Sequence, residues 1–187
     1  MSVTINNSPV HDDSIISYPY GVQNSGYSCG WHTGVDIIPH GATESNPILY
    51  PVFDGQVVEV NTNPNNSLGC YVLIYDSLNN IYWRYCHMVV NSIQVSVGQQ
   101  VTTNTPLGRM GMTGNATGIH LHLESATTSS WQCSTFVNPC NLLNIPNVDN
   151  TIIYYSGTPT PPTPAPIFSK KIKFPWFIIV AKKRRRS

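Results

Sequence analysis

The chain is poor in charged residues, and cations are almost absent from most of it. Only 10% of its 187 residues are charged, and Arg84 and Arg109 are the only lysines or arginines before position 170. All nine acidic residues lie before position 150, so the body carries a formal charge of −7, whereas residues 170–187 carry +8. This split predicts an acidic folded body and a separate basic tail.

Long apolar runs and long helix-forming segments are also missing. No stretch approaches the roughly 20 apolar residues that span a bilayer. The first residues, Met-Ser-Val-Thr-Ile, have no basic segment followed by an apolar one, so we expect no Sec-type signal peptide. Instead, 13 glycines and 15 prolines punctuate short apolar runs, which favours a mainly β fold with many turns.

Paired cysteine motifs are absent as well. The five cysteines, Cys29, Cys70, Cys86, Cys133 and Cys140, contain no Cys-x-x-Cys pair, and their odd number leaves at least one thiol unpaired within a monomer. We expect reduced thiols at buried positions, with a small loop closed by Cys133 and Cys140 as the alternative.

Composition divides the chain into four parts. We expect an N-terminal arm or edge strand over residues 1–17 and one folded domain over residues 18–155. Residues 156–166 are rich in Pro and Thr and predict an extended, semi-rigid linker. A basic and hydrophobic tail follows over residues 167–187.

Short strands fill the folded domain. An Asp54-Gly55 turn within residues 51–60 predicts one hairpin, and the runs 70–75 and 81–88 predict a second. Alternation of apolar and polar residues predicts further strands at 93–97 and 119–124. The fold class expected is therefore mainly β.

Histidines and a carboxylate occur at spacings that suit a metal site. His32 and Asp36 are four residues apart, and imidazole nitrogen and carboxylate oxygen both bind zinc. His120 and His122 are two residues apart in an expected strand, so their side chains share one face. His87 lies in another expected strand, where it would share a face with Trp83 and Tyr85.

Together these residues predict a catalytic metal. Such a site needs three protein ligands and an open position for water, with a nearby group to accept a proton. His32, Asp36 and one of His120 and His122 would bind the metal, and the other histidine and His87 would move protons. If both His120 and His122 bound it, the site would be closed and structural. An iron oxygenase with two histidines and one carboxylate is a second alternative.

The order of motifs resembles a known family, the lysostaphin-type (LytM-like) zinc metalloendopeptidases that hydrolyse peptidoglycan. The resemblance covers about residues 18–143. Its blocks are Tyr18-Pro-Tyr-Gly, His32-Thr-Gly-Val-Asp-Ile, Pro51-Val-Phe-Asp-Gly-Gln-Val, Tyr85-Cys-His-Met, Val97-Gly-Gln-Gln-Val with Leu107-Gly-Arg-Met-Gly-Met-Thr-Gly, and His120-Leu-His-Leu-Glu.

The resemblance implies a single antiparallel β-sheet or barrel-like domain with a substrate groove. It implies Zn²⁺ held by His32, Asp36 and His122, with His120 and His87 as the catalytic pair. The substrate would be peptide bonds in peptidoglycan stems or cross-bridges, and Tyr27 would correspond to a groove tyrosine that binds substrate. The turn at residues 39–47 is longer than the family's, which leaves substrate preference open. His40 in that turn is expected to be a solvated loop histidine.

Two further expectations concern the biological setting. Action at the cell wall without a Sec signal fits a bacteriophage endolysin or a tail-associated wall hydrolase, with a bacterial protein exported by another route as the alternative. The alternative to an enzyme is a non-catalytic wall-binding or activator module of the same fold. For the tail we expect binding to an anionic envelope surface. Its alternatives are a solvated tail and, for residues 182–186, nucleic acid, a partner that we do not expect.

Overall fold

The computed structural model describes residues 1–41 and 44–157. The basic tail and nearly all of the Pro/Thr linker lie outside these residues, so the expectations for them remain predictions. Within the described ranges, no helix has the length and apolar character needed to cross a membrane.

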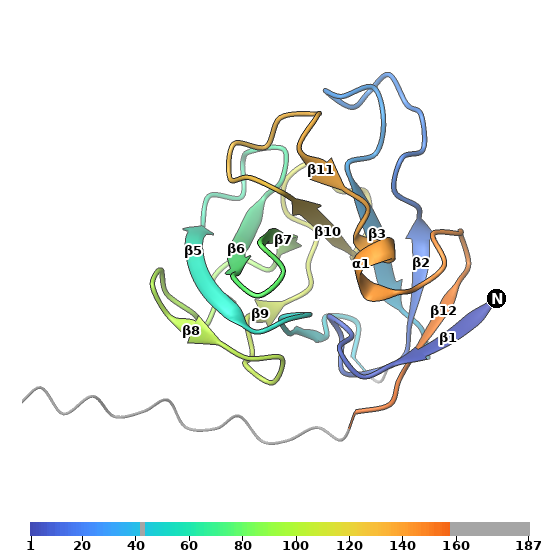
Figure 1. Cartoon of the computed structure of the whole chain (residues 1–187), viewed down its shortest axis with the longest axis horizontal. Coiled ribbons are helices and arrows are strands. Elements are labelled where there is room, and N and C mark those ends of the chain that lie inside the picture. The colour runs from blue at the N-terminus through green and yellow to red at the C-terminus, as the bar shows by residue number, and fades with distance from the viewer. Residues whose placement is uncertain (42–43, 158–187) are drawn as a thin grey trace, which may run out of the picture.

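Ten strands form one open sheet in the order β1-β12-β2-β3-β10-β7-β6-β5-β8, with β11 paired to β10, and β4 and β9 form a separate small sheet (Figure 1). The elements are β1 (Ser2–Ile5), β2 (Ser14–Tyr18), β3 (Gly34–Pro39), β4 (Ile48–Leu49), β5 (Gly55–Asn61), β6 (Cys70–Asp76), β7 (Ile81–Met88), β8 (Gln100–Val101), β9 (Gly108–Arg109), β10 (Leu121–Ala126), β11 (Phe136–Val137), α1 (Pro139–Leu143) and β12 (Ile152–Tyr155). The expectation of a mainly β fold is confirmed. Among the named pairs of strands, β1 and β12 run parallel and the others antiparallel.

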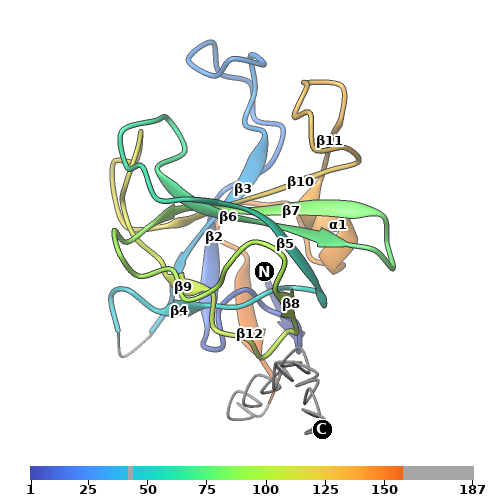
Figure 2. The same ribbon diagram turned by 90° about the vertical axis from the view of Figure 1, so that its left-hand side faces the viewer.

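The central strands β7 and β10 divide their side chains between the core and the opposite face of the sheet. Tyr85, Leu121 and Leu123 are fully buried in the core. Arg84 and Glu124 alternate with them and are directly opposite each other in the register, so they share the other face. The β2–β3 and β10–β11 loops rise on one side of the sheet, and β4, β9 and β12 lie on the other (Figure 2).

The hairpin of β6 and β7 forms as the sequence predicts. The Asp76 carboxylate accepts hydrogen bonds from the backbone N–H groups of Leu78 and Asn79, both at 3.0 Å. Asn80 adopts a left-handed conformation with φ of 55°, which Asn tolerates better than most residues. The aromatic and branched side chains that precede and follow this turn suit paired strands.

Two sequence-based expectations are wrong. The Asp54-Gly55 pair makes no hairpin, because β5 begins at Gly55 and pairs with β6 and β8. A Cβ on Gly55 would lie 2.5 Å from the Tyr75 carbonyl oxygen, so this glycine permits a close strand approach. Residues 93–97 form no strand: the Gln94 N–H donates to the Leu107 carbonyl, but the Ser96 N–H donates to the Gln99 side chain, so no regular strand pairing forms.

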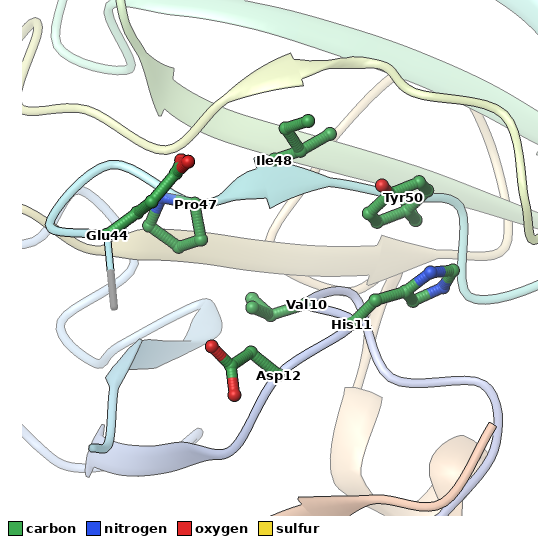
Figure 3. Close-up of a pocket in the computed structure, with 7 residues that line it drawn as sticks. All are labelled: Val10, His11, Asp12, Glu44, Pro47, Ile48 and Tyr50. Atoms are coloured by element: carbon green, nitrogen blue, oxygen red, sulfur yellow. The ribbon is translucent and has the colours of Figure 1, made fainter. Parts of the chain in front are cut away.

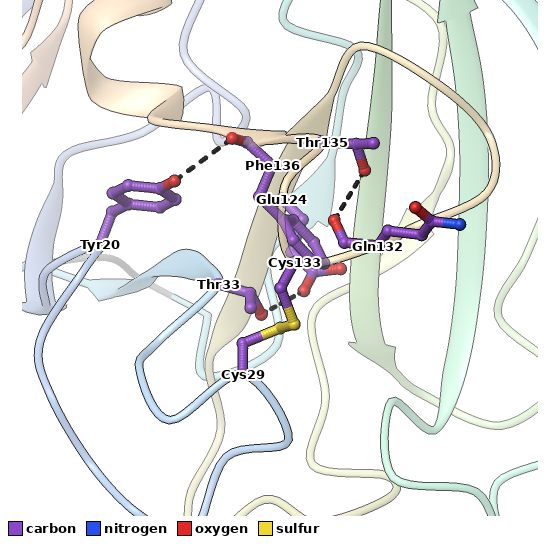
Figure 4. The surroundings of a disulfide bond; sticks show 8 residues. All are labelled: Tyr20, Cys29, Thr33, Glu124, Gln132, Cys133, Thr135 and Phe136. Atoms are coloured by element: carbon purple, nitrogen blue, oxygen red, sulfur yellow. Dashed lines mark hydrogen bonds between the residues drawn. A yellow bond between two sulfur atoms is a disulfide. The ribbon is translucent and has the colours of Figure 1, made fainter.

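A disulfide joins Cys29 in the β2–β3 loop to Cys133 in the β10–β11 loop (Figure 4). The expectation of reduced thiols is therefore wrong for these two residues, and so is the alternative Cys133–Cys140 loop. Cys70, Cys86 and Cys140 are free and buried, as expected. The pairing joins residues 104 positions apart, and no local pattern reveals it.

Replacing Cys29 and Cys133 together by serine is expected to lower the free energy of unfolding by about 2–5 kcal/mol, because the bond restricts a long loop of the unfolded chain. Guanidinium unfolding of the oxidised protein measures this difference. Dithiothreitol should destabilise the wild type and leave the double variant unchanged. Equal stability of the two proteins under oxidising conditions would contradict the expectation.

Candidate metal centre and active site

Three donor atoms converge on the face of the sheet opposite the core. His32 lies just before β3, Asp36 lies within β3, and His122 lies in β10 directly opposite Asp36. Asp36 Oδ1 is 3.1 Å from His32 Nε2 and 2.8 Å from His122 Nδ1. The two imidazole nitrogens are 3.0 Å apart. The three side chains can therefore offer their donor atoms to one ion, all within 4.8 Å of one another.

This donor set fits zinc. Two imidazole nitrogens and one carboxylate oxygen are common zinc ligands, and three protein ligands leave a fourth position for water or substrate. His32 is buried and His122 nearly so, whereas the Asp36 side chain is 15% exposed. The site therefore combines a mostly desolvated ligand set with a path from solvent.

Hydrogen bonds on the outer side of each histidine set which ring nitrogen is free. The Nδ1–H of His32 donates a hydrogen bond to the Pro19 carbonyl at 2.9 Å, which leaves Nε2 as the nitrogen able to bind a metal. The Nε2 of His122 lies 3.1 Å from Glu124 Oε1, which leaves Nδ1 toward Asp36. Outer partners of this kind fix the tautomer of metal-binding histidines.

The glycine between His32 and Asp36 is required by the packing of the site. A Cβ on Gly34 would lie 2.6 Å from the Leu123 carbonyl oxygen and 2.8 Å from the His122 ring. A side chain at this position would push the imidazole out of place.

His120 lies beside this group without joining the three closest donor atoms. It pairs with Gly111 just before β10 begins, and its Nδ1–H donates to the Gly118 carbonyl at 2.9 Å. Its Nε2 is free and lies 3.7 Å from Asp36 Oδ1. The expectation that His120 and His122 project to one side is confirmed.

His87 reaches the same side through an irregularity of β7. The register advances from Val72↔Tyr85 to Cys70↔Met88, so β7 carries one extra residue there. His87 itself has φ of 61°, and bulges of this kind redirect side chains. Its ring lies 4.7 Å from that of His120. The expectation that His87 shares the core face of Trp83 and Tyr85 is therefore wrong.

The site is also polarised electrostatically. Burial alone would raise the pKa of Asp36, but its close contacts with the His122 and His32 rings, which stabilise the ionised carboxylate when those rings are protonated, lower it well below its usual value. Burial alone would lower the pKa of His122, yet the charge of Glu124 and hydrogen bonds with Asp36 and Glu124 raise it to about 9. Burial and the neighbouring His122 and His120 lower the pKa of His87 to about 4. The centre thus favours positive charge, while His87 stays neutral at pH 7.

The metal-free protein should lose stability as pH rises from about 6.5 to about 9. The pKa of His122 is raised in the folded state to about 9, so its contribution is present below the unfolded value and disappears above the folded one. The expected loss of unfolding free energy is on the order of 3 kcal/mol. Urea unfolding in a chelator at several pH values measures it, with His122→Asn as control. A flat profile for the wild type would contradict the assignment.

Two tyrosines lie against the His32 imidazole. The Tyr27 ring, whose residue we expected to bind substrate, is 5.2 Å from it. The Tyr18 ring, whose residue faces Asp36 in the β2–β3 register, is 4.8 Å from it. Burial, with the charge of Asp36 second, raises the pKa of Tyr27, so its hydroxyl is neutral at pH 7.

The other two histidines lie elsewhere. His40 is exposed, as expected for a loop histidine. His11 stacks on Tyr50 and Tyr155, with ring centroids at 3.6 and 4.4 Å, at a pocket between residues 10–12 and β4 (Figure 3). His11 therefore packs between two tyrosine rings, and none of His32, His87, His120 and His122 lines this pocket.

Glu124 and Arg84 are parts of the site to which the sequence motifs assigned no role. Glu124 follows His122 by two residues, and this spacing in a strand could have indicated a shared face. Arg84 joins it only through the pairing of β7 with β10.

Comparisons with known proteins agree with this geometry. The peptidoglycan DD-endopeptidase ShyA of Vibrio cholerae is 38% identical over 92 residues, which cover 47% of this chain and 20% of that protein. The chain thus spans about a fifth of this curated relative. Among solved structures, the catalytic domain of lysostaphin from Staphylococcus simulans matches with a TM-score of 0.57 and 26% identity, covering 68% of this chain and 90% of that one. A zinc-containing peptidase from Vibrio cholerae matches with a TM-score of 0.51 and 29% identity, covering 64% and 36%.

The model of peptidase family M23 matches residues 30–133, more than half of the chain. This span contains His32, Asp36, His87, His120 and His122. The chain belongs to peptidase family M23, a family of zinc metallopeptidases.

Proposed function

We propose that this protein is a zinc-dependent endopeptidase that hydrolyses peptide bonds in the stems or cross-bridges of bacterial peptidoglycan. In this proposal His32, Asp36 and His122 bind zinc. The observation that carries it is the convergence of three donor atoms with two further histidines, His87 and His120, beside them. The names of the relatives, a peptidoglycan endopeptidase and the lysostaphin catalytic domain, support this class of substrate.

The two histidines outside the ligand set are suited to proton transfer. His87 donates its Nδ1–H to the Thr113 carbonyl at 2.7 Å, and His120 donates its own to the Gly118 carbonyl. Nδ1 of each ring is thus engaged, and Nε2 is the nitrogen left to accept or release a proton. The lowered pKa of His87, about 4, keeps that nitrogen neutral at pH 7. One imidazole accepts the proton of the attacking water at Nε2, and the other, with a proton on its own Nε2, donates a hydrogen bond to the developing oxyanion.

Zinc, when bound, supplies a Lewis acid for the scissile carbonyl and lowers the pKa of the attacking water toward about 7. The chain's part is to hold the three donor atoms in place and to return the accepted proton to the leaving amine. Tyr27 beside His32 offers a neutral hydroxyl, which we propose contacts the substrate.

The alternative is a non-catalytic wall-binding module of the same fold. The enzyme is favoured because His120 Nε2 lies 3.7 Å from Asp36 Oδ1 and the His87 ring lies 4.7 Å from that of His120, so two histidines adjoin the three converging donor atoms. Purified protein should be analysed for metal, and defined muropeptides digested with it should be examined by mass spectrometry. New peptide termini that depend on zinc and on His120 support the enzyme. Wall binding without cleavage, by a protein that retains zinc, supports the module.

We further propose a lytic setting, such as a phage lysin or tail-associated wall hydrolase. Protein added from outside should then solubilise intact walls in a turbidity assay. Wild type that cleaves soluble muropeptides but never clears wall suspensions would argue against this setting.

For the segment 167–187 we propose binding to an anionic lipid or wall polymer, because its charge is opposite to that of the body. Deleting it should leave cleavage of soluble muropeptides unchanged and weaken sedimentation with cells, with a difference that shrinks at high salt. Equal sedimentation at low salt would contradict the proposal.

A further inference from the structure

A buried carboxylate lies behind the His122 imidazole, on the side away from the other proposed ligands. Glu124 is 1% exposed, and its Oε1 lies 3.1 Å from His122 Nε2. The opposite ring nitrogen, Nδ1, is the one that faces Asp36 and His32. Glu124 therefore contacts the ring without entering the group of three donor atoms.

Every acceptor site of this carboxylate is engaged. Oε1 accepts a hydrogen bond from the Thr33 hydroxyl at 2.6 Å as well as from His122 (Figure 4 shows Thr33 and Glu124). Oε2 accepts from Arg84 Nε at 2.7 Å and from a terminal nitrogen of the same guanidinium. Because Arg84 uses both donors on Oε2, it leaves Oε1 free to face Thr33 and the imidazole.

The guanidinium is in turn held by aromatic rings. Arg84 is 9% exposed, and its central carbon lies 3.8 Å from the centre of the Trp131 ring and 5.7 Å from that of Tyr71. Trp131 belongs to the β10–β11 loop, which the disulfide at Cys133 joins to the loop that leads to Thr33. The ion pair is thus covered from the solvent side.

Stability alone does not account for this arrangement. Removing two charges from water is costly, and well-packed apolar residues often stabilise a fold as much as a buried ion pair does. Here the pair also does something an apolar pair could not, because an ionised oxygen beside Nε2 requires a proton on that nitrogen. In the neutral ring, the form that binds a metal, the lone pair of His122 is then left on Nδ1, where the other two donor atoms lie.

We propose that Glu124, oriented by Arg84 and Thr33, is a positioning residue that holds His122 in the tautomer and ring orientation for zinc binding. This inference rests on the proposed assignment of His122 as a zinc ligand. It adds to that assignment a specific dependence of zinc affinity on a carboxylate that does not itself touch the metal.

The principal test is the zinc dissociation constant of Glu124→Gln, measured by competition with a chromophoric chelator at fixed pH. Four donor N–H or O–H groups point at the carboxylate, and an amide offers them one acceptor oxygen and an NH₂ group that repels the rest. We expect zinc to bind about 10–100-fold more weakly. Arg84→Lys should also weaken zinc binding, because lysine cannot present two fixed donors to Oε2. The loss should be smaller than for Glu124→Gln, because the Glu124 carboxylate is still present.

Matched controls exist on the surface. Glu44→Gln removes the carboxylate of the exposed pair with Arg109, and Arg109→Lys alters the same pair from its other side. Both should bind zinc as the wild type does. Thermal unfolding of each metal-free variant separates a loss of affinity from a loss of fold.

The wild type provides a second measurement that needs no variant. Long-range ¹H–¹⁵N correlation spectra of the zinc-loaded protein should show His122 protonated at Nε2. A proton on Nδ1, or wild-type zinc affinity in a folded Glu124→Gln, would overturn the positioning role while leaving the proposed function intact. A wild type that binds no zinc would instead overturn the proposed function, and this inference with it.

Discussion

Substitution of His32, Asp36 or His122 by alanine is expected to remove zinc and abolish cleavage of peptidoglycan. Each residue supplies one of three donor atoms that lie within 4.8 Å of one another. After its removal only two protein ligands remain, which is fewer than a catalytic zinc needs. The loss of zinc affinity should exceed the roughly 10–100-fold effect typical of an outer partner. Metal analysis after gel filtration and muropeptide digestion measure the two effects.

His40→Ala is the matched control, because this exposed histidine follows β3 and is not one of the three residues whose donor atoms converge. It should keep both zinc and activity. Stoichiometric zinc and full turnover in any one of the three ligand variants would show that the corresponding residue is wrongly assigned.

His120→Ala is expected to keep zinc and to lose about 10²–10⁴-fold in turnover, the usual contribution of a general acid or base. His120 Nε2 lies 3.7 Å from Asp36, outside the 2.8 Å contact that His122 makes with the same oxygen. His87→Ala should behave in the same way, because its ring adjoins that of His120. Zinc content and the turnover number, measured on the same preparations, separate chemistry from binding.

The pH profile gives an independent check on His87. With its pKa lowered to about 4, His87 stays neutral throughout the range from pH 5 to 7, so its protonation should not reduce activity there.

Loss of zinc from His120→Ala would make His120 a ligand, and the site would then be closed. Unchanged turnover in both variants would remove the proposed catalytic pair.

The two groups of variants also separate the proposed enzyme from a wall-binding module. An enzyme loses cleavage in both groups, but loses zinc only in the first. A module with a structural zinc would lose stability in the first group and would be unaffected by changes at His120 or His87. The further role proposed for Glu124 predicts an intermediate pattern, in which zinc affinity declines but is not abolished.

Much of the site could be predicted from local spacing. His32 and Asp36 are separated by one short turn into β3, and His120 and His122 by a single strand step, so each pair follows from backbone geometry alone. The hairpin of β6 and β7 likewise depends on a turn of four residues, 77–80, in which two backbone N–H groups donate to the Asp76 side chain at the end of β6. Periodicity of two identified the buried Leu121 and Leu123.

Other features depended on the three-dimensional structure. The side of the sheet that His87 reaches is decided by one extra residue in β7 relative to β6, and a strand pattern cannot reveal an insertion in its partner's register. Gly55 resembled a turn glycine but serves a close contact with β6.

Sequence by itself determined the kinds of chemistry available to this protein: imidazole and carboxylate donors at strand and turn spacings, in a β-rich, acidic body. The tertiary structure decided which of them meet. His32 and His122 are 90 residues apart, Arg84 and Glu124 are 40 apart, and Cys29 and Cys133 are 104 apart. Local periodicity reports only which face of its own strand a residue occupies. Contacts at these separations arise from strand pairing and loop closure, which depend on the free energy of the whole fold.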